Sequence, residues 1–255
     1  MTGAIGKPVL RKEDARLLTG KGQFTDDANA PGQVHSVMVR SPHSHARILG
    51  IDTAAAMAMP GTLAVYSGID CAADGLGAIP HSPLPKTQHD LKLTGPGGSH
   101  VFIGPHMALP ADKARHVGEA VAMVIAETKS QALDAAELVR VDYEPLPHNS
   151  DALAAAQSAQ PSVWDELPGN VCVDSVFGDV AATDAAFAAA KHVVSAAFHI
   201  GRVTGVPIEP RAALAIYDKG SGRTTIHAGS GGAVRQKHEI AQVLLGIYIY
   251  RVSSC

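Results

Sequence analysis

The sequence is poor in cysteine and in aromatic residues, and these shortages exclude several kinds of protein. The three cysteines, Cys71, Cys172 and Cys255, are far apart and form no C-x-x-C pair. This spacing excludes a zinc finger or an iron–sulfur loop built from nearby cysteines, and an odd, sparse count favours a reducing compartment. Aromatic residues make up 4% of the chain, which argues against a platform that stacks the bases of single-stranded nucleic acid.

An excess of charge and long apolar runs are also missing. The formal net charge is -3 over 255 residues, so there is no electrostatic reason to expect nucleic acid as a partner. No run of about 18 apolar residues is present, and we therefore expect no membrane span. The first residues contain no apolar segment typical of a secretory signal, so we expect a cytoplasmic protein.

Residues 115–147 contain the clearest pattern of secondary structure. Residues 120–126 (AVAMVIA) are apolar on both faces, which predicts a strand that is covered on both sides. Thr128 and Gln131 have the spacing of a capping box, so a helix is expected to start there. Residues 139–143 alternate between apolar and polar and predict a half-buried strand, ended by prolines. The block is therefore predicted to be a strand–helix–strand unit.

The same rules predict elements on both sides of this block. The predicted strands are residues 34–39, 63–66, 193–200 and 224–228. The predicted helices are residues 54–59, a helix capped by Thr183 and Asp184 that runs to Lys191, and residues 233–245. Residues 68–104 are rich in Gly, Pro, Ser and His without periodicity, and they predict a long surface excursion.

Histidines raise the question of a metal site. His43 and His45 form an H-x-H pair, but no third ligand is visible nearby, and a closed site normally needs four. A polar turn after a strand is the favoured interpretation. The spacing of the loop histidines matches no metal template; they are His81, His89, His100 and His106.

Four short motifs follow one another along the chain. They are RSPHSHAR at residues 40–47, VGEAVA at 117–122, VDYEPLP at 141–147 and VPIEPRA at 206–212. Together they resemble the amino-terminal portion of the large, molybdenum-binding subunit of the xanthine dehydrogenase / aldehyde oxidase / aerobic carbon monoxide dehydrogenase family. Ile208 stands where that family usually has Met.

The resemblance implies an α+β fold, an α/β-hammerhead-like domain followed by the incomplete start of the molybdopterin-binding α+β domain. The expected segments are an arm at 1–25, the hammerhead-like domain at 26–147, a linker at 148–162, a partial molybdopterin-binding domain at 163–247 and a tail outside the resemblance at 248–255. The resemblance also implies a molybdenum–molybdopterin cofactor, and partner subunits that carry FAD and 2Fe–2S centres.

A glycine-rich turn lies between a predicted strand and a predicted helix, an arrangement that can present backbone N–H groups to an anion. It comprises Gly229, Ser230, Gly231 and Gly232. The turn lacks the Lys of a P-loop, and a dinucleotide fingerprint would need Gly in place of Val234. As a nucleophile elbow around Ser230 it lacks a later Asp, and the only later candidates, His238 and Glu239, are adjacent and in the wrong order.

The resemblance offers a further interpretation of this turn. Many family members have Ser-Thr-Gln there, and the Gln approaches an oxo group on molybdenum; its position in this chain is Gly229. We predict that residues Gly229 to Gly232 line the cofactor cavity without that side-chain hydrogen bond, and we assign no catalytic or metal-binding residue. Upstream, Glu209 and Arg211 are expected to form a buried pair with a structural role.

The resemblance implies oxidation of an aldehyde, an N-heterocycle or carbon monoxide, with water as the source of oxygen. The glutamate that acts as general base in the family, and most of its cofactor-binding segments, are not found among these residues. We therefore expect the chain to be inactive alone. The alternative is a non-catalytic scaffold or assembly fragment of such a complex.

Overall fold

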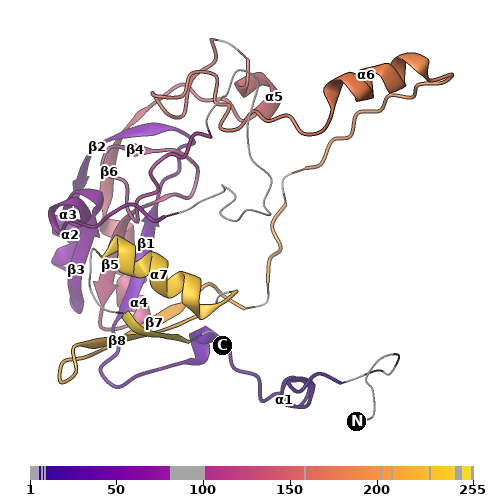
Figure 1. Ribbon diagram of the computed structural model, residues 1–255. Helices are drawn as coiled ribbons and strands as arrows, with labels where there is room; N and C mark the ends of the chain where they lie inside the picture. Colours follow the sequence, from indigo (N-terminus) through magenta and orange to yellow (C-terminus); the bar gives the residue numbers. More distant parts are fainter. Residues whose placement is uncertain are drawn as a thin grey trace. The chain divides into compact units, whose positions relative to one another are not determined.

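The computed structural model describes residues 6, 8, 10–80, 101–157, 159–201, 203–207, 209–229, 231–244 and 249–253. Their helices and strands are mixed along the chain, and the strands form three separate three-stranded sheets, as in an α+β protein (Figure 1). The described part of the chain divides into two compact units. One is formed mainly by residues 34–204 and the other by residues 1–33, 205–241 and 246–255.

The first sheet of the larger unit has a central strand that is buried on both faces. β5 (Ala120–Ala126) pairs antiparallel with β1 (His35–Arg40) on one side and with β3 (Thr62–Ser67) on the other. Val121 and Ala122 are both fully buried, and successive residues of a strand point to opposite faces. The predicted strand, with its two covered faces, is therefore confirmed.

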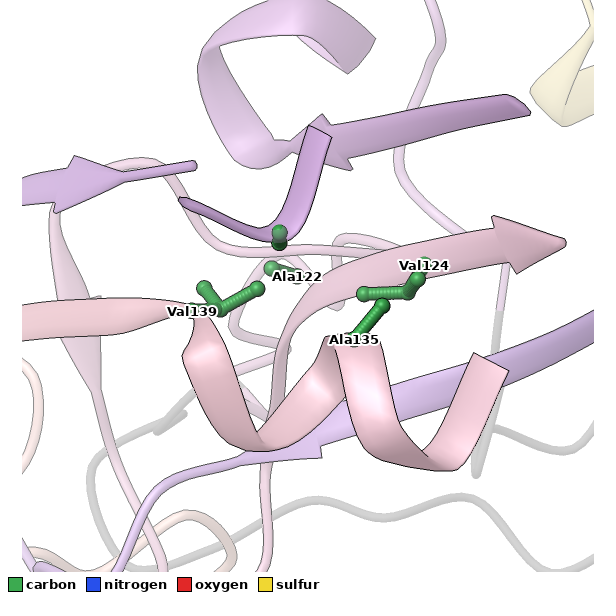
Figure 2. Close-up of a cluster of buried hydrophobic side chains, with 5 residues drawn as sticks. Ala122, Val124, Ala135 and Val139 are labelled. Carbon is green, nitrogen blue, oxygen red and sulfur yellow. The ribbon is translucent and has the colours of Figure 1, made fainter. Parts of the chain in front are cut away.

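Helix α4 (Lys129–Leu138) packs on this sheet and contributes to its core. The Thr128 side chain accepts a hydrogen bond from the backbone N–H of Gln131, which confirms the predicted helix start. Ala135 and Val139 meet Ala122 and Val124 of β5 in a cluster of small buried side chains, as Figure 2 shows. Because the side chains are small, the helix can approach the sheet closely.

The second sheet of this unit combines one strand that follows α4 with two strands that precede it in the chain. β6 (Arg140–Pro145) pairs antiparallel with β2 (Ala46–Asp52), which pairs on its other edge with the short β4 (Lys113–Ala114). The predicted strand–helix–strand block thus connects two different sheets. Among the described residues before 160, three short helices complete the unit; they are α2 (Ala54–Met57), α3 (Gly68–Ala73) and α5 (Ala152–Ala155).

The smaller unit contains the third sheet. β8 (Arg223–Ala228) pairs antiparallel with β7 (Ala213–Asp218) and parallel with β9 (Ile249–Ser253). Helix α7 (Ala233–Val243) follows β8 after the glycine-rich turn, so the predicted strand–turn–helix order is confirmed. The amino-terminal elements of this unit are α1 (Asp14–Leu18) and the single turn η1 (Thr25–Asp27).

Three sequence-based expectations are wrong. The surface excursion expected at residues 68–104 begins instead with α3, because Ser67 and Asp70 form a capping box; residues 81–100 of this segment lie outside the described residues. Helix α6 (Val180–Ala189) is capped by Asp179, whose carboxylate accepts the N–H of Ala182, and not by Thr183 and Asp184. Residues 193–200 form no strand, because an alternating pattern still needs a partner strand for its hydrogen bonds.

Candidate functional site

The glycine-rich turn starts where the buried end of β8 reaches the surface. Ile226 and Ala228 are buried, and Gly229 follows directly. A Cβ added at Gly231 or Gly232 would meet no heavy atom within 4 Å, so a ligand can approach the backbone at both residues. Ser230, the remaining predicted residue of the turn, lies outside the described residues.

A carboxylate lies directly against Gly229. A Cβ at this glycine would come within 3.1 Å of Oε1 and 3.3 Å of Oε2 of Glu209. The same Oε1 accepts hydrogen bonds from the backbone N–H and the hydroxyl of Thr25, each 3.2 Å long. Thr25 is 2% exposed, so this contact joins the amino-terminal segment to the turn within one compact unit.

Glu209 does not form the expected pair with Arg211. Arg211 is exposed, and among the described residues no ion pair joins it to Glu209. The Thr25 donors take the place of the guanidinium, because hydrogen bonds from a backbone N–H and a hydroxyl also compensate a partly buried carboxylate. The sequence could not show this partner, since it lies 184 positions away.

On helix α7, Glu239 pairs with an arginine of the same helix. The Glu239 carboxylate lies 2.6 Å from Nε of Arg235, four residues earlier on the helix. This is the ordinary i,i+4 pair of a helix surface. No cluster of three or more His, Cys, Asp or Glu suited to a metal ion occurs among the residues that the structure describes.

In the larger unit, two of the four motifs meet through their backbones. Ser41 of the first motif donates to the carbonyl of Glu119 and accepts from the N–H of Gly118, both bonds being 2.8 Å long. Gly118 has φ +86°, a conformation that favours glycine. These two backbone hydrogen bonds continue the pairing of β1 with β5 beyond the ends of the two strands.

The H-x-H histidines separate into two different surroundings. The His43 ring packs edge-on against Tyr143, with the ring centres 4.9 Å apart. His45 is buried, and its Nδ1 lies 3.2 Å from the carbonyl oxygen of Pro147. The polar turn expected between the first two strands is confirmed, since β1 ends at Arg40 and β2 begins at Ala46. Of the loop histidines, His81, His89 and His100 lie outside the described residues.

A pocket of about 520 Å³ opens beside these motifs, and sequence patterns did not indicate it. The guanidinium carbon of Arg115 lies 4.1 Å from the ring centre of Trp164, a cation–π contact, and both residues line the pocket. Glu119 lines it too and accepts the backbone N–H of Arg115. The signal that could have found the pocket is Trp164 itself, the only tryptophan of the chain.

No helix in the described part of the chain is long and apolar enough to cross a bilayer. Two domain families match the chain in succession. Residues 19–147 match the family described as "Aldehyde oxidase and xanthine dehydrogenase, a/b hammerhead domain". Residues 163–253 match the "Molybdopterin cofactor-binding domain".

Similar proteins cover most of this chain. The large subunit of nicotine 6-hydroxylase from Paenarthrobacter nicotinovorans is 41% identical over 216 residues, which is 84% of this chain and 24% of that protein. The carbon monoxide dehydrogenase large chain of Afipia carboxidovorans is 34% identical over 235 residues, 87% of this chain and 27% of that protein. The chain thus spans about a quarter of the length of these relatives.

Solved structures show the same likeness. Quinoline 2-oxidoreductase from Pseudomonas putida 86 superposes with a TM-score of 0.79 at 32% identity, over 96% of this chain and 29% of that chain. A Cu,Mo-CO dehydrogenase superposes with a TM-score of 0.76 at 30% identity, over 97% and 30% of the two chains. The hammerhead domain and the start of the cofactor-binding domain therefore follow one another as expected.

Proposed function

The chain belongs to the aldehyde oxidase and xanthine dehydrogenase family of molybdenum hydroxylases, and we propose that it forms the first part of a large subunit of such an enzyme. The cofactor of the family is molybdenum–molybdopterin. The reaction that we propose for the whole enzyme is oxidation of an aldehyde, an N-heterocycle or carbon monoxide, with water as the source of oxygen. The observation that supports this most is that the glycine-rich turn lies between a strand and a helix inside the part of the chain that matches the cofactor-binding domain.

The turn fits a cofactor that is approached through backbone atoms. Gly231 and Gly232 leave open space next to the first residues of α7, and N–H groups at the start of a helix favour an anionic group. Gly229 is less suited to an anion, because the Glu209 carboxylate lies against it and would repel one. We therefore propose that Gly231 and Gly232 form the cofactor-facing part of the turn and that Gly229 serves the packing of Glu209.

When bound, the molybdenum cofactor supplies the redox chemistry, and the protein supplies binding and orientation. The described turn offers no side chain that could take a proton from substrate or water. We propose that the chain alone is inactive and that groups outside it complete the site. Partner subunits with FAD and 2Fe–2S centres would then accept the electrons, in the cytoplasm.

A non-catalytic scaffold is the second candidate, and the missing side chain at Gly229 is what favours it. Molybdenum analysis of the purified full chain, expressed together with its neighbouring genes, separates the two. Stoichiometric molybdenum supports the enzyme, and its absence supports the scaffold.

A charge variant makes this measurement specific to the turn. Gly231→Glu places a carboxylate in open space and should lower the molybdenum content at least tenfold, because it repels the anionic groups of the cofactor. Gly201→Glu makes the same substitution at another exposed, open glycine and should leave the content unchanged. Equal loss in both variants would show that the turn has no special part in cofactor binding.

A further inference from the structure

A second pocket, of about 320 Å³, lies in the larger unit, and the proposed function makes no use of it. Its polar lining comes from three segments of the larger unit. Those side chains are His45, Arg47, Lys113, Ser162 and Asp165. Two permanent cations and a histidine therefore share the pocket with a single carboxylate.

Lys113 is a buried ammonium group with spare donors. The residue is 8% exposed, and its Nζ lies 2.6 Å from Oδ2 of Asp165. Among the described residues this carboxylate is the one hydrogen-bond partner of the ammonium group, which can donate three bonds. The Asp165 side chain is 75% exposed, so water competes for it and it compensates the buried charge only in part.

His45, which also lines the pocket, has an unpartnered ring nitrogen. Its Nδ1 lies against the Pro147 carbonyl, which can only accept, so Nδ1 carries the proton. Its Nε2 is buried and has no hydrogen-bond partner among the described residues. A buried polar atom without a partner is costly, which indicates that a bound group or water satisfies it.

Arg47 completes the positive side of the pocket. Its Nε donates to Glu144 over 2.8 Å, and no other hydrogen bond of its guanidinium occurs among the described residues. The two terminal nitrogens are thus free to bind an anion in the forked geometry that suits oxygen pairs. The charges also converge on Asp165: its pKa lies below the usual value, chiefly because Lys113 donates to it, with Arg115 and His45 adding smaller effects.

We propose that this pocket is a binding site for a small oxyanion, a carboxylate or a phosphate, held by Lys113 and Arg47. The anion accepts the spare N–H bonds of Lys113 and of the Arg47 guanidinium. The Ser162 hydroxyl is a further donor at the rim of the site.

Titration of the full chain with inorganic phosphate, and separately with acetate, tests the site by calorimetry. We expect saturable binding of at least one of them, with a Kd of about 1 mM. Arg47→Gln should weaken it about tenfold, since one charge-assisted contact is lost. Arg140→Gln is the matched control, because Arg140 is an exposed arginine of the same sheet outside the pocket, and it should bind as the parent does.

The Asp165→Asn variant should instead strengthen the binding of the anion. It leaves the buried Lys113 ammonium without its carboxylate, so an added anion should bind about fivefold more tightly and raise the Tm more than in the parent. Non-saturable heats, or a weakening in Arg140→Gln equal to that in Arg47→Gln, would overturn the proposal.

Discussion

Gly68 begins α3 against the backbone of Pro110 and Ala111, where no side chain has room. Gly104 lies in the same way under the ring of Trp164, and Gly229 lies under the carboxylate of Glu209. None of these three glycines has a positive φ, so conformational freedom does not require them. At the scale of the residue they serve close approach, and the neighbours that make them necessary are distant in sequence.

Gly68→Ala should destabilise the larger unit by about 2 kcal/mol, because its Cβ would collide with backbone atoms that cannot rotate away. Urea unfolding measures the difference. Gly50→Ala is the control: Gly50 lies in β2, and a Cβ there meets nothing within 4 Å, so little or no stability should be lost. Equal losses in the two variants would contradict the packing argument.

The Asp70 carboxylate has a lowered pKa, chiefly because the Ser67 side chain donates to it, followed by the Ser67 backbone N–H. A lowered pKa in the folded state means that Asp70 stabilises the fold above its unfolded value of 3.8. That stability is lost as the pH falls through the folded value. Ser67→Ala should therefore raise the pKa of Asp70 towards 3.8, as measured by NMR titration of the carboxyl carbon. An unchanged titration curve would show that the hydroxyl has no such effect.

At the scale of the element, two helices of the larger unit start with threonine but in different ways. Thr128 caps α4 with its hydroxyl, whereas Thr53 makes no side-chain cap bond to α2. The N–H of Ala54 is instead satisfied by Asp52, over 3.0 Å. Residue type at the start of a helix thus suggests a cap, and geometry decides which side chain makes it.

Thr128→Ala should cost about 1 kcal/mol of unfolding free energy, since an N–H at the start of α4 loses its acceptor. Thr53→Ala makes the same chemical change without removing a cap bond and should cost much less. Chemical denaturation of the two variants side by side measures the difference. A cost at Thr53 as large as that at Thr128 would mean that burial, and not capping, matters at these positions.

Element prediction succeeded where local pattern and burial agree. The apolar run of β5 became the central strand of a sheet, and the T-x-x-Q start of α4 became a real cap. It failed for residues 193–200, whose alternation resembles that of β6 but which pair with nothing in the described chain. A strand depends on a neighbour, which a local pattern does not specify.

At the scale of the whole molecule, burial differs sharply along the chain. The larger unit has a core of fully buried residues between α4 and β5. In the same unit, α6 has no buried residue, and Val194, Phe198 and Ile200 after it are each more than 85% exposed. Large apolar side chains left open to solvent in this way are typical of surfaces that a further chain or segment covers.

Limited proteolysis of the full chain should therefore cut first within residues 190–206, and the half from Asp165 to Cys255 should be degraded before residues 24–147. Mass spectrometry of the early fragments identifies the cuts. Co-expression with the neighbouring subunits should slow cleavage at these sites if they cover the exposed side chains. A carboxy-terminal half as resistant as residues 24–147 would contradict the prediction.

The sequence by itself determined the family, the order of the two domains and most helices and strands of the larger unit, because these depend on short motifs and on local periodicity. It also located the glycine-rich turn between a strand and a helix. Only the tertiary structure decided that Glu209 takes Thr25 as its partner, and that Lys113, Arg47 and His45 share a pocket. Such contacts join residues far apart in the chain, and local patterns contain no record of which distant groups the fold brings together.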